Sequence, residues 1–457
     1  MDLNDLKNKT IHVVGLSGTE GSSLALFLIL LGGKNLIGHE IKSAKDFKKN
    51  FFSYQDNLSK KQKEKTFQLI VKSFSKINFD KKYLQGLSKN DIIFAPSSWF
   101  RYPVNGKLKK YRLWNWYNLL LEFFPGKVVG VTGTAGKGTV TNLVYQMLVA
   151  SKKKAFLVGE SWHFVDFYKI IKSGSDAIVV AEVNNRTLTF ARYVKKSPAI
   201  ALITNIFPHH LDDHGHSFAN YKKVKLNLCK YQSEHDTLII NADDLVLKKI
   251  TWPNRTIFYG EKKNSLPKIT NPYFSSTHLK SDALAAMQLA KILKIKANVV
   301  KKTLNNFAPR SGRMEFVRSV KGVRYINDSA ATRPKATLLA VKSLPLNKGI
   351  LILEGSRINP DELKGEYQAL INTIKTMKVR LVLTSGLITP YLSKLFKLHG
   401  LELVAVENLQ TSVKRAFKST NAGDVVLLSP ANESFGEFKD YRERGAKFIK
   451  LVNKLSL

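Results

Sequence analysis

Short apolar runs alternate along most of the chain with longer stretches of helical periodicity. The run 11–14 ends at a turn with glycines at positions 15, 18 and 21, and an apolar helix is predicted over 24–31. The same order recurs where the run 128–132 meets a second glycine-rich turn before a predicted helix over 140–148. This alternation is typical of α/β proteins with mainly parallel sheets. We therefore predict an α/β fold.

The pattern divides the chain into three blocks, which we interpret as domains over residues 1–125, 126–307 and 308–457. The first and third are expected to be Rossmann-like and the second to be a P-loop ATPase-like parallel-sheet domain. Further strands are predicted at 35–41, 91–94, 155–158, 177–183, 200–204, 237–241, 349–353, 380–383, 401–406 and 425–429, and a helix at 281–293. Segment 42–90 is lysine-rich and lacks a clear period, so we expect an insertion or a mobile helical stretch there.

The composition is that of a soluble globular protein, with 44% hydrophobic residues in 457. The apolar run at 24–31 is too short to span a bilayer, and no signal-peptide pattern opens the chain. A single cysteine, Cys229, excludes a disulfide framework and a cysteine-based zinc site. We expect a cytoplasmic monomer.

The net charge of +38 reflects 73 basic against 35 acidic residues. The lysines are spread widely, and no basic helix or arginine-rich tail stands out. Lysine-rich solvated faces explain this better than specific nucleic-acid binding, although weak attraction to anionic surfaces or substrates is compatible with it.

The glycine-rich turn of the second block has the composition of a phosphate site. Its candidate nucleotide contacts are Gly133, Thr134, Gly136, Lys137, Gly138 and Thr139. Backbone N–H groups and the helix dipole at such a turn favour an anion, and a lysine reaches the terminal phosphates. The spacing departs from G-x-x-x-x-G-K-[ST], since Val131 replaces the first glycine and Gly138 follows the lysine. The alternative is a plain turn with a surface lysine.

Polar residues cluster after the next strands of this block. Glu182 ends one strand, and a loop with three histidines and two aspartates (209–214) follows another. Carboxylates with few nitrogens suit magnesium or manganese, and a capped polar turn is the alternative. The stretch 221–226, which contains Lys225, has the charge pattern of a solvated helix face. Two further polar turns, 327–333 and 429–435, follow strands of the third block and could be ordinary capped loops.

In their order along the chain these motifs resemble the Mur ligases. The matching features are the phosphate loop, the strand-end Glu, the His-x-Asp loop, the Tyr-x-x-x-Lys helix, Asn-Ala-Asp-Asp, Gly-Arg-x-Glu, Asp-Ser-x-Ala-Thr and Ser-Pro-Ala-x-x-Ser, over about 130–448. The third-block motifs are most similar to those of members that add D-glutamate to UDP-N-acetylmuramoyl-L-alanine. The resemblance implies that ATP phosphorylates a carboxylate, that an incoming amine attacks the acyl phosphate, and that peptidoglycan precursors are the product.

The resemblance also implies roles by position. The catalytic residues would be Lys137, Glu182, His210 and Lys225, and Mg²⁺ or Mn²⁺ would be held by Thr139, Glu182, His210 and a carbamylated Lys225, with Asp212 supporting the loop. ATP would be bound by the phosphate loop together with Asn241, Arg313 and Asp328. D-glutamate would be held by Thr332, Ser434, Phe435 and Tyr441, and the UDP-linked substrate would contact Gly15, Ser17 and Gly18.

Several positions depart from the family pattern. Gly138 replaces a Ser or Thr, which leaves Thr139 as the hydroxyl beside the lysine; segment 159–161 lacks the usual asparagine; Ala330 replaces a common lysine; and 354–358 replaces a Gly-Gly-x-x-Lys element. The alternatives are therefore an ATP-dependent amide ligase with another donor or acceptor, such as a folylpolyglutamate synthase-like enzyme, and a basic ATP-binding module without ligase activity.

Overall fold

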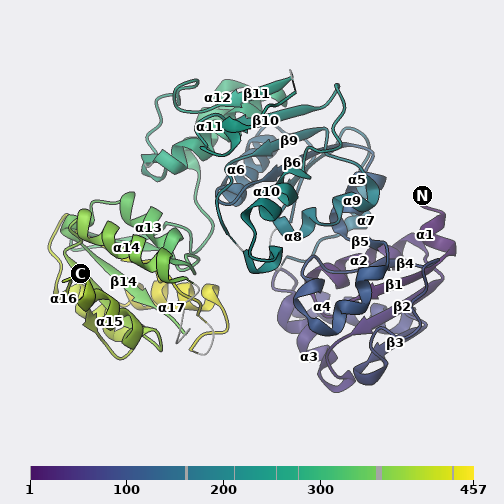
Figure 1. Ribbon diagram of the computed structural model, residues 1–457, viewed down its shortest axis with the longest axis horizontal. Helices are drawn as coiled ribbons and strands as arrows, with labels where there is room; N and C mark the ends of the chain where they lie inside the picture. Colours follow the sequence, from purple (N-terminus) through teal and green to yellow (C-terminus); the bar gives the residue numbers. More distant parts are fainter. Residues whose placement is uncertain are drawn as a thin grey trace. The chain divides into compact units, whose positions relative to one another are not determined.

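The computed structural model describes residues 2–159, 163–209, 211–253, 255–275, 277–356, 363–434 and 437–456. Its strands form three sheets, and the chain divides into two compact units. The first unit, Met1–Ile269 with Lys280–Asn305, holds the first two sheets, and the second, Thr270–Leu279 with Asn306–Leu457, holds the third (Figure 1). The predicted α/β class is confirmed. The domain boundaries at 125 and 307 stay a prediction.

The first sheet is wholly parallel, in the order β3-β2-β1-β4-β5. Its strands are β1 (Thr10–Val14), β2 (Asn35–Glu40), β3 (Lys76–Phe79), β4 (Ile92–Phe94) and β5 (Leu113–Trp114), and its helices are α1 (Asp5–Asn8), α2 (Thr19–Leu31), α3 (Ala44–Tyr54) and α4 (Lys60–Ser73), with 3₁₀ turns at Asp80–Lys82, Trp99–Arg101 and Pro103–Lys110. The next helix, α5 (Trp116–Phe123), packs against α9 (Ala191–Val194) of the second sheet. The apolar α2 is buried on most of its surface, as its sequence predicts.

The helical stretch expected within 42–90 is present, but the segment is part of the first sheet's fold and not an insertion. This segment forms α3, α4 and β3, and β3 pairs with β2 as an edge strand. The lysines of α3 and α4 lie on their solvent sides, while Phe47, Phe51, Phe67 and Ile70 are buried. The apolar stripe of each helix is narrow, so the charged residues mask its period.

The second sheet is also parallel, in the order β11-β10-β9-β6-β8-β7. Its strands are β6 (Lys127–Thr132), β7 (Ala155–Val158), β8 (Ile178–Glu182), β9 (Ile200–Ile203), β10 (Thr237–Asn241) and β11 (Thr256–Tyr259). Its helices are α6 (Lys137–Ala150), α7 (Phe167–Ile171), α8 (Asn185–Leu188), α9 (Ala191–Val194), α10 (Phe218–Leu226), α11 (Thr277–Ile292) and α12 (Ala297–Asn306), with 3₁₀ turns at Leu211–His214, Leu247–Lys249 and Pro272–Ser275. The central β6 delivers the phosphate loop to the carboxyl edge of the sheet.

The third sheet is mixed, in the order β12-β13-β17-β14-β15-β16. Its strands are β12 (Glu315–Val320), β13 (Val323–Asn327), β14 (Gly349–Glu354), β15 (Leu381–Ser385), β16 (Val404–Ala405) and β17 (Val425–Leu428), and its helices are α13 (Pro334–Lys342), α14 (Lys364–Thr376), α15 (Thr389–Leu398), α16 (Leu409–Lys418) and α17 (Tyr441–Asn453), with a 3₁₀ turn at Leu346–Lys348. Only β12 and β13 are antiparallel, and the two residues between them, Lys321 and Gly322, both have positive φ, the geometry of a tight hairpin turn.

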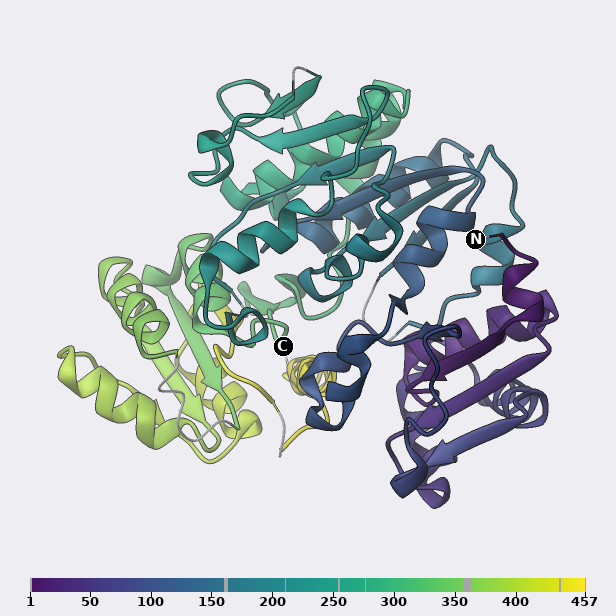
Figure 2. The same cartoon turned by 45° about the vertical axis from the view of Figure 1, so that its right-hand side comes forward.

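Helices cover both faces of this third sheet (Figures 1 and 2). Leu351 and Leu353 of β14 join a core with α13, α14 and α15, whereas Ile350 and Ile352 join a core with α16 and α17. A strand buried on both faces has a continuous apolar sequence, which is why β14 was easily predicted. No helix in the described part of the chain is long and apolar enough to cross a membrane.

Candidate functional site

The phosphate loop is a tight turn between β6 and α6 that two glycines make possible. Gly133 has φ +153°, and a Cβ there would lie 1.8 Å from Thr204 Oγ1. Gly136 has φ +83°, and a Cβ there would lie 2.1 Å from Asp282 Oδ1. Both positions therefore require glycine for backbone conformation and for space.

The two residues that follow β9 hold the phosphate loop in position by hydrogen bonds. Thr204 Oγ1 donates to the Ala135 carbonyl at 2.6 Å, and Asn205 Oδ1 accepts from the Ala135 amide at 2.8 Å. Asn205 also accepts at its own carbonyl from Thr134 N at 2.9 Å. The loop is thus fixed in position by its neighbour strand, and Asn205 is a functional residue that the sequence pattern did not single out.

Two lysine amino groups converge on one carbonyl of the loop. Lys137 Nζ donates to the Gly133 carbonyl at 2.9 Å and to the Thr134 carbonyl at 3.2 Å. Lys225 Nζ, from α10, donates to the same Gly133 carbonyl at 2.8 Å and to Thr132 Oγ1 at 3.3 Å. The Lys225 side chain is 1% exposed, so the interpretation of this position as a solvated helix face is wrong.

Burial and two neighbouring charges set the pKa of Lys225. Burial lowers the pKa of Lys225 well below its usual value, the charge of Lys137 lowers it further, and Glu182 acts in the opposite direction. Glu182 ends β8 and pairs in register with Val131 of β6. The structure therefore brings three of the four predicted catalytic residues together, and the fourth, His210, lies outside the described residues.

Thr139 lies in the first turn of α6 and donates its hydroxyl to Asp282 of α11. Asp282 is 6% exposed, and burial raises its pKa to about 7 against the opposing effects of Thr139 and Lys137. The motifs of the sequence do not include Asp282. An acid within the alanine- and leucine-rich first turns of a predicted core helix was the available signal.

The loop after β9 is held by ion pairs. Asp213 Oδ2 accepts from Arg186 Nε at 2.7 Å, and its Oδ1 accepts from Arg101 Nε at 3.1 Å. Asp212 Oδ2 lies 3.4 Å from Arg101 Nη2, and His214 Nε2 lies 2.9 Å from the Asn185 amide nitrogen. Among the described residues, no group of three or more His, Cys, Asp or Glu side chains is arranged to hold a metal. The aspartates serve to anchor the loop.

Asn241, at the end of β10, bonds to Thr204, the residue that also holds the phosphate loop. Its side-chain nitrogen donates to the Thr204 carbonyl at 2.9 Å, and its oxygen accepts from Asp243 N at 3.0 Å. It is 7% exposed. These bonds fix the ends of β9 and β10 relative to each other. Contact of Asn241 with a nucleotide base stays a prediction.

The glycine turn of the first sheet is occupied by a carboxylate. Gly15 has φ +74°, and the amide of Ser17 donates to Glu40 Oε2 at 2.8 Å. Gly18 begins the turn into α2, where its carbonyl accepts from Ser22 N at 2.9 Å. Glu40 is 1% exposed and is the last residue of β2. The three predicted substrate residues therefore lie together at the carboxyl edge of the first sheet.

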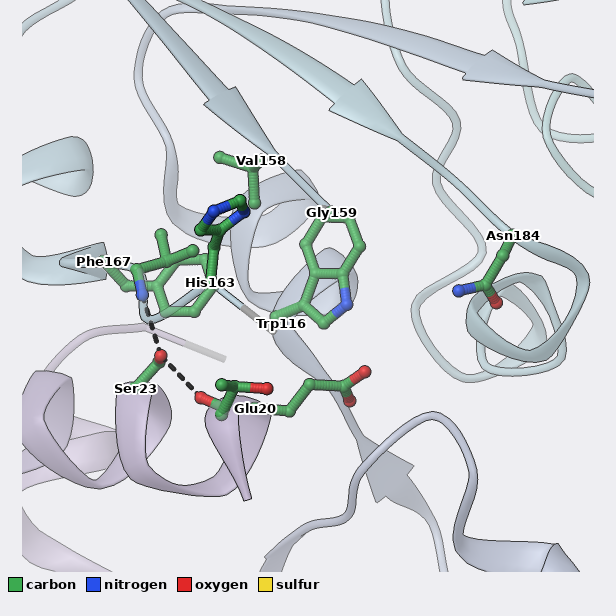
Figure 3. Close-up of a pocket in the computed structure, with 10 residues that line it drawn as sticks. Glu20, Ser23, Trp116, Val158, Gly159, His163, Phe167 and Asn184 are labelled. Carbon is green, nitrogen blue, oxygen red and sulfur yellow. Dashed lines mark hydrogen bonds between the residues drawn. The ribbon is translucent and has the colours of Figure 1, made fainter. Parts of the chain in front are cut away.

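A small cleft of about 70 Å³ lies beside this turn, between α2 and the ends of β7 and β8 (Figure 3). Glu20, Trp116 and Asn184 line it. Glu20 accepts from the amide of Ser97 at 2.6 Å and from its hydroxyl at 3.1 Å, and burial raises the Glu20 pKa. Ser23 Oγ accepts from Val165 N at 2.9 Å, which ties α2 to the second sheet.

In the second unit, Asp328 is held at the end of β13. Ser429 Oγ donates to its Oδ2 at 2.8 Å, and the Met314 amide donates to its Oδ1 at 3.1 Å. Burial raises the Asp328 pKa to about 7, against these bonds and the charge of Arg313. Arg313 is exposed. The two predicted ATP residues of the third block are therefore neighbours.

A buried arginine joins the loops that carry the predicted amino-acid residues. Arg444 of α17 donates to Glu354 Oε2 at 2.6 Å and to the backbone carbonyls of Glu354, Ser329 and Asn432. Both side chains of the pair are at most 1% exposed. Burial raises the Glu354 pKa to about 7, with Arg444 opposing. Arg444 was not singled out, and Glu354 was noted only as a departure from the family pattern.

This network connects the loops that carry Thr332 and Ser434 with Tyr441, the first residue of α17. Ala431 N donates to the Ala331 carbonyl at 3.0 Å, and Ser329 Oγ donates to the Tyr441 carbonyl at 2.7 Å. Phe435 lies outside the described residues, as do residues 357–362, which contain the remainder of the departing element after Ser356.

Comparison with known proteins agrees with this site. Residues 131–303 match a family described as the Mur ligase middle domain. The chain is 29% identical to the UDP-N-acetylmuramoylalanine--D-glutamate ligase of Koribacter versatilis, over 99% of each chain. It is 31% identical to the Bacillus subtilis protein of the same name, over 75% of this chain and 78% of that one.

Solved structures show the same fold. The MurC ligase of Thermotoga maritima gives a TM-score of 0.61 at 17% identity, covering 98% of this chain and 99% of that one. The MurF ligase from the same organism, in complex with ADP, gives 0.60 at 16%, covering 99% of both. The resemblance seen in the motifs is thereby confirmed over the full length, and the chain belongs to the Mur ligase family.

Proposed function

We propose that this protein joins D-glutamate to UDP-N-acetylmuramoyl-L-alanine in an ATP-dependent reaction of peptidoglycan precursor synthesis. The observation that carries the proposal is the convergence of Lys137, Lys225 and Glu182 at the glycine turn that precedes α6. The names of relatives aligned over most of their length support the same donor and acceptor. A cytoplasmic location follows from the need for ATP and UDP-linked substrates.

The chemistry needs a leaving group, because a carboxylate is a poor electrophile. A carboxylate oxygen of the donor attacks the γ-phosphorus of ATP, and ADP leaves. The amine of the acceptor then attacks the acyl carbon, inorganic phosphate leaves with that oxygen, and the amine loses a proton. Catalysis is mostly positioning and charge neutralisation around crowded oxyanions. Lys137 and the N-terminus of α6 supply fixed positive charge for this purpose.

The donor set fits a magnesium ion in part. Glu182 offers a carboxylate beside the loop, and Lys225 has the lowered pKa that keeps an amine neutral and able to react with carbon dioxide to form a carbamate. Glu182, His210 and the carbamate of Lys225 would hold the ion. The Thr139 hydroxyl donates a hydrogen bond to Asp282, which leaves the lone pairs of its oxygen able to bind the ion as well. When bound, the ion would neutralise phosphate charge.

Ala330 and segment 354–358 depart from the family pattern near the predicted amino-acid residues, so the test varies the acceptor. Phosphate release by the purified protein should require UDP-N-acetylmuramoyl-L-alanine, ATP and D-glutamate together. Turnover with another amino acid but none with D-glutamate would overturn the acceptor and preserve the ligase. Turnover with a folate donor in place of the UDP-linked one would overturn the donor.

A further inference from the structure

A second concave site lies on the second sheet, at the edge opposite the phosphate loop. It is a groove of about 710 Å³ between the last turn of α10 and the amino ends of β10 and β11. Its floor is apolar and includes Leu226, Leu238, Ile250 and Trp252. The Trp252 Nε1 donates to the Leu247 carbonyl at 3.0 Å, so the indole NH is satisfied and the ring is fixed in orientation. The site is preformed and has the size of a small-molecule pocket.

Four of the six charged residues that line the groove are cations, and these four have no carboxylate partner among the described residues. Lys222, Lys223, Lys230 and Arg255 line it, and within the described residues none of the four forms an ion pair with a carboxylate. Arg255 donates instead to the Glu234 carbonyl at 2.8 Å, and Lys230 lies 5.4 Å from the centre of the Tyr231 ring.

The two acids of the groove do not balance these cations. Asp236 is already the acceptor for the Ser233 amide at 2.7 Å and the Ser233 hydroxyl at 2.9 Å. Glu234 is paired at 3.7 Å only with the exposed His235. The groove therefore combines an apolar floor with an excess of positive charge at its rim, which favours a ligand of the complementary kind.

We propose that this groove binds a small amphipathic anion, a molecule with an aromatic or acyl body and one carboxylate, sulfonate or phosphate group. The apolar body would cover Leu226 and Trp252, and the anionic group would lie near Lys223 and Lys230. The site is independent of the proposed ligase reaction, because parallel strands place the phosphate loop at the other edge of the sheet. One helix, α10, separates the two, with Tyr221 and Lys225 buried on its other side.

The probe pair 8-anilinonaphthalene-1-sulfonate and N-phenyl-1-naphthylamine tests the proposal on the full chain, since the two differ in the sulfonate. The sulfonate probe should bind with enhanced fluorescence, and the neutral probe should bind more weakly. The double variant Lys223→Glu/Lys230→Glu should weaken sulfonate binding roughly threefold to tenfold and leave neutral binding unchanged. The matched control Lys61→Glu/Lys65→Glu, on exposed positions of α4, should change neither.

The single cysteine of the chain locates the bound probe. Cys229 lines the groove, and burial raises its pKa to about 11, so alkylation by iodoacetamide should be slow. A saturating sulfonate probe should slow it further, by about fivefold or more if the groove is filled, whereas ATP should neither slow it nor displace the probe. Equal binding of both probes, insensitivity to the charge reversals, or an unchanged alkylation rate would each overturn the proposal.

Discussion

Two glycine turns of the first unit have the same local form and opposite charges. Each follows a parallel strand and opens a helix. In the first turn Glu40 accepts from the Ser17 amide at 2.8 Å, and Glu20 lies in the first turn of α2. In the second, Lys137 lies in the first turn of α6, and Lys225 Nζ is 2.8 Å from the Gly133 carbonyl.

The difference shows which turn is built to receive phosphate. A carboxylate near a helix N-terminus is favourable and satisfies the amides that an anion would otherwise use, as Glu40 does for Ser17. A lysine at the same place is unfavourable until an anion arrives. The first turn is therefore complete by itself, whereas the second concentrates cations that only a polyanion would balance. The diphosphate of a UDP-linked substrate must find donors other than the Ser17 amide.

The largest expected effect is that of Lys137→Ala, which removes the cation of the second turn. Turnover should fall by about 10³-fold or more, because a fixed charge on the transferred phosphoryl group is lost. Stability should be unchanged or rise by less than about 1 kcal/mol, because an unfavourable charge leaves the N-terminus of α6. Phosphate release and thermal unfolding measure the two. Near-normal turnover would remove the loop from the mechanism.

Lys225→Ala should also abolish turnover, with a difference that separates the two lysines. A short carboxylate such as acetate should restore part of the activity if Lys225 acts as a carbamate, and it should not rescue Lys137→Ala. The control Lys301→Ala, at an exposed position of α12, should keep full activity. Intact ATP binding without any rescue by acetate would count against a carbamate.

The variant Glu40→Gln tests whether the Glu40 carboxylate stabilises the first glycine turn. The charged acceptor of the Ser17 and Lys42 amides becomes a neutral amide that can satisfy only part of this demand. The free energy of unfolding should fall by about 1.5–3 kcal/mol, as is typical for a buried bond to a charged group. ATP affinity should not change. The exposed-site variant Glu64→Gln should cost much less, and equal costs in denaturant unfolding would contradict the role given to Glu40.

A smaller, pH-dependent effect is expected at Asp282, whose pKa is raised to about 7 from an ordinary value near 3.8. Between these values the folded state binds more protons than the unfolded state, so stability should fall as pH rises towards 7 and the loss should be complete above it. Asp282→Asn should reduce this slope. Part of it should remain, because the pKa of Asp328 is raised in the same way. Urea unfolding at pH 5 and pH 8 measures the slope, and an unchanged slope would show that Asp282 is not the titrating group.

The sequence predicts the sheets better than the contacts between distant residues. Strands buried on both faces, such as β6 and β14, are continuous apolar runs, and the glycine turns mark where helices begin. Lysines hide the narrow apolar stripes of α3 and α4, and the sequence pattern does not predict β11 or β12, whose residues are mostly only partly buried. Periodicity is a local signal.

The site was predicted unevenly for a related reason. Lys137 and Glu182 follow from local motifs, whereas the charge pattern around Lys225 indicates a solvated face and only the family resemblance gives that lysine a role. Asp282 and Arg444 each bond to residues far away in the sequence. Asp282 accepts from Thr139, and Arg444 donates to Ser329 and Glu354. No local pattern contains such a pairing, because the fold creates it.

The transfer of an oxygen atom tests the central claim most directly, namely that the cation-rich turn sends the γ-phosphoryl group to a carboxylate. The donor carboxylate is labelled with ¹⁸O, one turnover is allowed with ATP and D-glutamate, and the released phosphate is analysed by mass spectrometry. An acyl phosphate predicts one ¹⁸O in each phosphate formed with product. Phosphate without the label, its fourth oxygen drawn from water, would contradict the account.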